Sequence, residues 1–218
     1  MVSEVIEAVK NNKLIAICRA VPPEKILAVA DALYAGGFRL MELAFDQSRP
    51  DTWSITAQSI RAIAEKYKGR MFVGAGTVLT PELVDLATEN GASFIVSPDY
   101  NQKVVAHTKA LGLCSIPGAM TPSEITAAYY AGADFIKLFP ICDLGLGYLR
   151  SIRAPLSHIP LLAVGNVNAE TLGDYLRAGC VGAAIGGCVV NKKYIASGEY
   201  EKITEMAEKL MKIAKGEE

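Results

Sequence analysis

Residues 121–140 read TPSEITAAYYAGADFIKLFP and contain, in order, a helix start, a helix, a helix stop and a buried strand. Thr121 places a capping hydroxyl before Pro122, which suits the first helical position. Gly132 can end the helix in the left-handed conformation that glycine adopts without strain. The apolar run 134–139 then has the length and composition of a strand covered on both faces. The stretch therefore predicts one complete helix–strand unit.

The same unit recurs through the chain. Short apolar runs that predict strands alternate eight times with longer amphipathic segments that predict helices. The expected strands are residues 14–18, 38–45, 71–75, 93–97, 113–117, 134–139, 161–164 and 181–185. An amphipathic helix at residues 1–13 precedes the first strand. This alternation is typical of a parallel sheet.

Eight such units can form a closed barrel or an open, doubly wound sheet. A dinucleotide-binding sheet has a G-x-G-x-x-G run after its first strand, whereas this chain has only the short glycine turn GAGTV at 74–78. The length of 218 residues fits one barrel and is short for two domains. We therefore expect an α/β fold, a single (β/α)₈ TIM barrel over residues 1–218 with an N-terminal helix. Its functional side chains should lie at the carboxyl ends of the strands.

Composition excludes several classes of function. The net charge of −1 argues against binding to nucleic acid or to an anionic membrane, both of which require an excess of basic residues on one face. The first residues lack the basic start and apolar stretch of a secretory signal, so we expect a cytoplasmic protein. Neither the five single cysteines nor His107 and His158 have metal-binding spacing. We expect a small-molecule substrate and neither a metal nor a cofactor.

The strand at 134–139 carries a lysine inside an otherwise apolar run. Because strand side chains alternate, Phe135, Lys137 and Phe139 share the face that points into the barrel. Desolvation lowers the pKa of such a lysine and increases the fraction of neutral amine that can attack a carbonyl. The alternative is a structural lysine that pairs with an interior carboxylate.

Glu42 in the second strand is the candidate partner of Lys137. Glu42 shares its face with Leu40 and Ala44, and strands two and six lie opposite each other in an eight-stranded barrel. The carboxylate can pair with the ammonium, or it can accept and return protons during carbinolamine and enamine chemistry. A purely structural ion pair is a costly way to fill a barrel, because burying both charges often gains little stability.

Further candidates follow the other strands. Arg19 can bind a substrate carboxylate through its planar fork, and Thr77 can donate a hydrogen bond to the same group. Pro98 also stands at a strand end. The glycine turns after the last two strands occupy the usual phosphate pocket of these barrels, although such turns also occur for purely steric reasons. These turns contain Gly165, Asn166, Gly186, Gly187 and Cys188.

The chain resembles the 2-keto-3-deoxy-6-phosphogluconate aldolases and the related 4-hydroxy-2-oxoglutarate aldolases. The motifs that carry the resemblance are ICRA at 17–20, MEL at 41–43, GAGTV at 74–78, VSP at 96–98, IPGAMTPSE at 116–124 and IKLFP at 136–140. The resemblance implies a metal-independent class I aldolase in which Lys137 forms an imine with pyruvate or a 2-keto acid. It implies Glu42 as general acid/base, Arg19 and Thr77 as carboxylate-binding residues, Phe139 and Pro98 as pocket-shaping residues, and a homotrimer.

Three positions depart from the family pattern. Asp46 stands where some members have an arginine, VGN at 164–166 replaces Thr-Gly-Gly, and Cys188 replaces a serine that helps bind phosphate. Asp46 would repel an anionic substrate, and Asn166 could bind a different distal group. These changes leave the pyruvate chemistry intact, but the identity of the keto acid and its phosphorylation stay open.

We therefore expect an aldehyde-lyase that cleaves a 2-keto-3-deoxy sugar acid, 6-phosphorylated in the favoured case, or 4-hydroxy-2-oxoglutarate, to pyruvate and an aldehyde. A sugar-phosphate isomerase or epimerase on the same barrel is the first alternative, and it requires two acid/base groups that flank one carbon. A non-catalytic ligand-binding barrel is the second, and the altered phosphate turns are its motivation.

Overall fold

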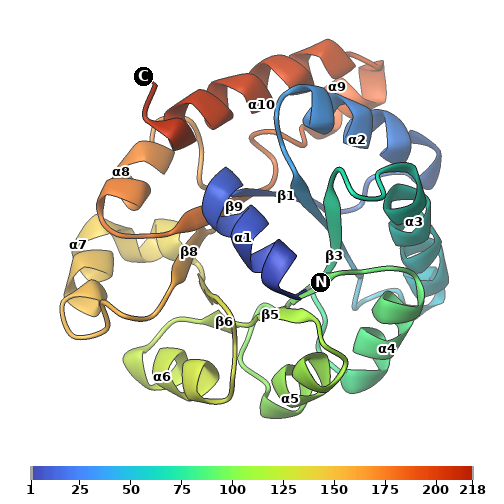
Figure 1. Ribbon diagram of the computed structural model, residues 1–218. Coiled ribbons are helices and arrows are strands. Elements are labelled where there is room, and N and C mark those ends of the chain that lie inside the picture. Colours follow the sequence, from blue (N-terminus) through green and yellow to red (C-terminus); the bar gives the residue numbers. More distant parts are fainter. Residues whose placement is uncertain (1, 218) are drawn as a thin grey trace.

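The computed structural model describes residues 2–217, which form a parallel barrel surrounded by helices (Figure 1). The strands are β1 (Leu14–Cys18), β2 (Leu40–Ala44), β3 (Phe72–Gly76), β4 (Phe94–Val96), β5 (Cys114–Ile116), β6 (Gly118–Ala119), β7 (Ile136–Leu138), β8 (Leu161–Val164) and β9 (Gly182–Ile185). Their hydrogen-bonded order is β5-β4-β3-β2-β1-β9-β8-β7-β6, and all the pairs are parallel.

The strands β5 and β6 are two halves of one barrel strand, separated by Pro117. The first half pairs with β4 and the second with β7, so together they close the barrel. The Pro117 carbonyl accepts a 2.9 Å hydrogen bond from the Lys137 amide, but proline has no N–H to donate to a ladder. The expected eight-stranded TIM barrel is confirmed, with its fifth strand divided at this residue.

The helices lie around the outside of the barrel, except for the first one, which lies across its amino-terminal end (Figure 1). They are α1 (Val2–Asn12), α2 (Ile26–Ala35), α3 (Trp53–Lys66), α4 (Pro81–Glu89), α5 (Gln102–Ala110), α6 (Pro122–Tyr130), α7 (Ile141–Arg153), α8 (Leu172–Arg177), α9 (Lys192–Ser197) and α10 (Tyr200–Lys215), with short 3-10 turns η1 (Pro23–Lys25) and η2 (Pro50–Thr52). The hydroxyl of Thr121 caps α6 in a capping box with Glu124, and Gly132 follows this helix at φ +99°. The start and stop read from the sequence are therefore confirmed.

The amino-terminal half of the barrel lumen is filled with apolar side chains. Ile15, Leu40, Phe94, Phe135 and Leu162 meet there, and α1 covers this end of the barrel through its buried Val5 and Val9 (Figure 1). The lumen is thus solid towards α1, and space for a ligand remains at the carboxyl ends of the strands. No helix within residues 2–217 is long and apolar enough to cross a membrane.

Candidate active site

A cavity of about 710 Å³ opens at the carboxyl ends of the strands. All the site residues predicted from the sequence line it: Arg19, Glu42, Thr77, Pro98, Lys137, Phe139, Gly165, Asn166, Gly186, Gly187 and Cys188. Sequence reasoning missed the apolar residues Ile17, Val164, Val167, Ala184 and Val190 and the polar residues Asn191, Lys192 and Lys193. Strand alternation could have found Ile17 and Ala184, because they lie two residues before the predicted site residues Arg19 and Gly186, respectively.

Lys137 lies on β7 inside the barrel and is only 6% exposed. Burial lowers the pKa of its amine, and the Arg19 guanidinium lowers it further, whereas Glu42 and Asp99 oppose the shift. Its nitrogen lies 4.7 Å from the centre of the Phe139 ring. Burial is the largest of these influences on the pKa, so the neutral, nucleophilic amine is favoured relative to an ordinary lysine.

Glu42 lies on β2, opposite β7, and is 2% exposed. Burial raises the pKa of its carboxyl group, against the lowering influence of Lys137 and Arg19. Its Oε2 atom is buried without a hydrogen-bond partner, and no ion pair within 4.0 Å joins it to Lys137 among the residues that the structure describes. The structure therefore does not contain the direct ion pair that a purely structural lysine would need.

Gly76, at the end of β3, makes room for the Glu42 carboxylate. A Cβ atom at residue 76 would lie 2.6 Å from Oε1 and 3.0 Å from Cδ of Glu42. Real Cβ atoms essentially never approach another heavy atom closer than 3.0 Å. The carboxylate thus keeps its position because residue 76 has no side chain.

Arg19 and Thr77 come together at the mouth of the barrel. The Arg19 Nη2 atom donates a 3.3 Å hydrogen bond to the Thr77 hydroxyl, although the two residues lie 58 positions apart in the chain. Arg19 is exposed and Thr77 is half-buried, so a planar carboxylate can reach both. Pro98 lines the same cavity after β4.

The loops after β8 and β9 form the outer wall of the cavity. At Gly165, φ is +112° and an added Cβ would lie 3.2 Å from backbone atoms of Pro140 and Ile141, so glycine has a steric role there. At Gly187 an added Cβ would meet nothing within 4 Å, so the steric explanation does not hold for this residue. The half-buried Cys188 has its sulfur 3.9 Å from the sulfur of Met206 on α10.

Two lysines extend this wall. Lys192 and Lys193 open the short helix α9, are exposed and line the cavity. The side chain of Asn191 accepts a 2.9 Å hydrogen bond from the Lys193 amide and thereby caps α9. The outer part of the cavity is therefore electropositive.

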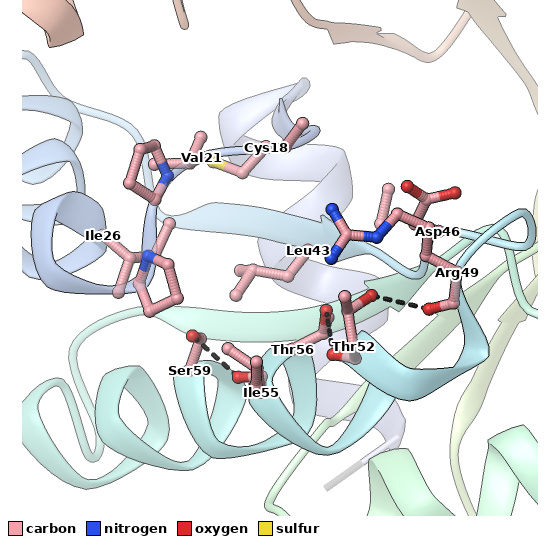
Figure 2. A pocket seen from close by; sticks show the side chains of 14 residues that line it. Cys18, Val21, Ile26, Leu43, Asp46, Arg49, Thr52, Ile55, Thr56 and Ser59 are labelled. Carbon is pink, nitrogen blue, oxygen red and sulfur yellow. Dashed lines mark hydrogen bonds between the residues drawn. The ribbon is translucent and has the colours of Figure 1, made fainter.

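Asp46 lies outside this cavity. Its Oδ1 atom accepts hydrogen bonds from the amide and the hydroxyl of Ser48, at 3.0 and 2.6 Å, and these bonds hold the pKa of its carboxyl group below the usual range. Asp46 lines a second cavity of about 340 Å³, bounded by α3 and the residues that lead into α2 (Figure 2). Figure 2 shows Asp46 and Arg49 at one side of this second cavity. None of the predicted site residues lines it.

A closed parallel barrel that buries a lysine of lowered pKa opposite an unpaired carboxylate is the arrangement of a class I, lysine-dependent lyase. The sequence model of the KDPG and KHG aldolases matches residues 5–206. The chain therefore belongs to the KDPG and KHG aldolase family, and it is a metal-independent aldolase.

Individual relatives agree with this family. The chain is 34% identical over 200 residues to the 2-dehydro-3-deoxy-6-phosphogalactonate aldolase of Escherichia coli strain K12, covering 91% of this chain and 93% of the relative. A solved native KDPGal structure superposes with a TM-score of 0.83 at 33% identity, covering 93% and 94% of the two chains. A designed, cube-shaped protein cage made by fusing symmetric oligomeric domains superposes equally well, at 32% identity over 94% of this chain and 72% of the cage chain.

Proposed function

We propose that the protein cleaves a 6-phosphorylated 2-keto-3-deoxy sugar acid to pyruvate and a phosphorylated aldehyde through an imine at Lys137. The observation that carries the proposal is the buried Lys137 amine, which shares one cavity with the unpartnered Oε2 atom of Glu42. The amine attacks the keto carbon, and loss of water gives an iminium ion that acts as an electron sink.

Glu42 moves the protons in the steps that follow. It accepts the proton of the C4 hydroxyl as the C3–C4 bond breaks, so the aldehyde leaves and an enamine remains on Lys137. Glu42 then returns the proton to C3, and water hydrolyses the imine to release pyruvate and the free amine. The raised pKa of the Glu42 carboxyl group suits this role, because it makes the carboxylate a stronger proton acceptor than an ordinary glutamate.

Arg19 and Thr77 bind the carboxylate of the substrate. Their hydrogen bond places the guanidinium fork and the hydroxyl side by side at the mouth of the barrel. Phe139 and Pro98 shape the apolar wall beside the keto acid. This arrangement orients the keto carbon towards Lys137.

The distal end of the substrate meets the loops after β8 and β9. Gly165, Asn166, Gly186, Gly187 and Cys188 line this end of the cavity. Lys192 and Lys193 supply positive charge there, which favours a phosphorylated substrate over a neutral one. The alternative substrate, 4-hydroxy-2-oxoglutarate, carries a carboxylate at the same end.

An isomerase or epimerase finds less support. Such an enzyme requires two acid/base groups that flank one carbon. Of the residues that line the cavity, Glu42 is the one carboxylate, and none is a histidine. The inward-facing lysine suits imine chemistry better.

Trapping of the imine tests the proposal. The protein is incubated with pyruvate, reduced with borohydride and mapped by peptide mass. We expect the adduct on Lys137 and its loss in Lys137→Ala. A folded protein without an adduct, or an adduct on another lysine that survives Lys137→Ala, refutes the imine mechanism. Comparison of phosphorylated and unphosphorylated keto acids as substrates then identifies the distal group.

We also propose that the protein is a homotrimer that acts in the cytoplasm. The similarity to a chain fused from symmetric oligomeric domains supports self-association. The free state of Cys18, Cys114, Cys142, Cys180 and Cys188 suits a reducing compartment. A mass in solution of three 23.3 kDa chains, and recovery in the cytoplasmic fraction of the source cells, are the expected results.

A further inference from the structure

The turn after β3 holds Thr77 in an unfavourable backbone conformation. Its φ angle is +57°, in the left-handed region, where a β-branched side chain crowds its own backbone. Such residues keep this conformation only when their surroundings impose it, and they cluster at functional sites.

Three successive carbonyls of this turn accept hydrogen bonds from neighbouring strand ends. The Phe45 amide donates to Gly76 at 2.9 Å, and the buried Ser97 hydroxyl donates to Val78 at 2.6 Å. The Thr77 carbonyl lies between these two and accepts a 2.7 Å hydrogen bond from Nε2 of Gln47. The hydrogen bond to the backbone carbonyl of the strained residue thus comes from the side chain of Gln47.

Gln47 does not line the cavity, so its route to a ligand there is the hydrogen bond to Thr77. The same backbone conformation that Gln47 stabilises directs the Thr77 hydroxyl to Nη2 of Arg19. A preorganised pair binds a carboxylate better than two mobile groups, because less freedom is lost on binding.

We propose that Gln47 is a positioning residue for the substrate carboxylate. It holds Thr77 in the left-handed conformation that presents its hydroxyl, together with Arg19, to a 2-keto acid. This inference rests on the proposed function, in which Arg19 and Thr77 bind that carboxylate. The loop after β2, which contains Gln47, thus contributes to recognition of the keto acid.

The test compares a charged and an uncharged ketone. Imine formation is measured by borohydride trapping at increasing concentrations of pyruvate and of methyl pyruvate, whose ester lacks the anionic carboxylate. Gln47→Met removes the donor and keeps a similar length. Gln58→Met is the matched control, because Gln58 is exposed on α3 and lies outside the cavity.

We expect Gln47→Met to raise the half-saturating pyruvate concentration about tenfold, equivalent to about 1.4 kcal/mol. The methyl pyruvate curve and the maximal trapping rate should match those of the parent protein, and Gln58→Met should match it for both ketones. Equal weakening of both ketones, or an unchanged pyruvate curve, overturns the positioning role. If the parent protein itself forms no pyruvate adduct at Lys137, the proposed function fails, and the positioning role fails with it.

A second comparison, made in a Thr77→Gly variant, distinguishes the positioning role from a general folding defect. Glycine adopts positive φ without strain, so Thr77→Gly keeps the turn and removes the hydroxyl that Gln47 positions. In the Thr77→Gly background, Gln47→Met should cause no further loss of pyruvate binding. An undiminished effect of Gln47→Met in that background shows that Gln47 does not act through Thr77 and overturns the proposal.

Discussion

The inner and outer halves of the cavity are built in different ways. The inner half consists of strand side chains, Lys137 on β7 and Glu42 on β2, both buried above an apolar lumen. The outer half consists of loop and helix-start residues such as Asn166, Lys192 and Lys193, which are exposed. Burial shifts the pKa of both inner groups, whereas the outer groups act as solvated charges and hydrogen-bonding groups. Two of the three departures from the family pattern lie in the outer half, so the chemistry of bond cleavage and the choice of substrate can change independently.

We expect the largest fall in the cleavage rate when the inner nucleophile, Lys137, is removed. Lys137→Met keeps most of the side-chain volume but removes the amine, so cleavage should fall by at least about 10⁴-fold. Steady-state turnover and borohydride trapping measure the loss. Turnover that persists in a folded Lys137→Met variant refutes the covalent mechanism.

Removal of the inner acid/base, Glu42, should lower the cleavage rate less than removal of Lys137. Glu42→Gln keeps the shape of the side chain and should lower the cleavage rate by about 10²–10⁴-fold. Exchange of the pyruvate methyl protons with deuterated water, followed by NMR, should slow by a similar factor, because it requires the same proton transfer. Exchange at the parent rate in Glu42→Gln excludes Glu42 as the proton carrier.

Gly76→Ala tests whether the position of the carboxylate matters as much as its presence. The new methyl group must displace Glu42 Oε1, and a displacement of about 1 Å at a reacting group can cost about 10²-fold in rate. Turnover should therefore fall, whereas trapping by Lys137 should be affected less. Gly147→Ala on α7 is the control, because an added Cβ there meets nothing within 4 Å and Gly147 does not line the cavity.

The pH dependence of trapping tests the electrostatic coupling of the inner groups. Lys137 reacts when it has lost its proton, so the trapping rate should rise with pH, with a midpoint below the ordinary pKa of lysine. Glu42 raises the pKa of Lys137 and Arg19 lowers it, so Glu42→Gln should move the midpoint to lower pH and Arg19→Gln should move it to higher pH. Shifts of the opposite sign contradict the described burial and charge arrangement.

The smallest effect is expected in the outer half. Lys192→Gln and Lys193→Gln should each raise the KM for a phosphorylated substrate by less than about fivefold, because exposed charges are screened by solvent. The pyruvate trapping curve should not change. The effect on KM should shrink at high salt, and an equal effect on pyruvate trapping would show that the two halves of the cavity are not independent.

The sequence predicted the inner half well because strand side chains alternate strictly. That period places Lys137 and Glu42 inside the barrel, and the count of eight strands places them opposite each other. The predicted strand at 113–117 included Pro117, and the structure divides the strand there because proline donates no ladder hydrogen bond.

The residues of the outer half lie on loops and a helix start, where the sequence has no periodic pattern comparable to strand alternation. Lys192 and Lys193 reach the cavity because the loop after β9 turns into α9, a path that depends on tertiary packing. Asp46, expected to repel an anionic substrate, lies in a loop outside the cavity, where its carboxylate accepts hydrogen bonds from Ser48. The contact between Gln47 and Thr77 joins two loops, and no local pattern in the sequence indicates it.

The helix α1, which seals the amino-terminal end of the lumen with Val5 and Val9, has a consequence for the order of events in catalysis. The cavity opens at the opposite end, so reactant and products use the same mouth. The aldehyde is free as soon as the C3–C4 bond breaks, whereas the three-carbon fragment is still bonded covalently to Lys137. The aldehyde therefore departs first and pyruvate last, and in the condensation direction pyruvate must enter before its partner.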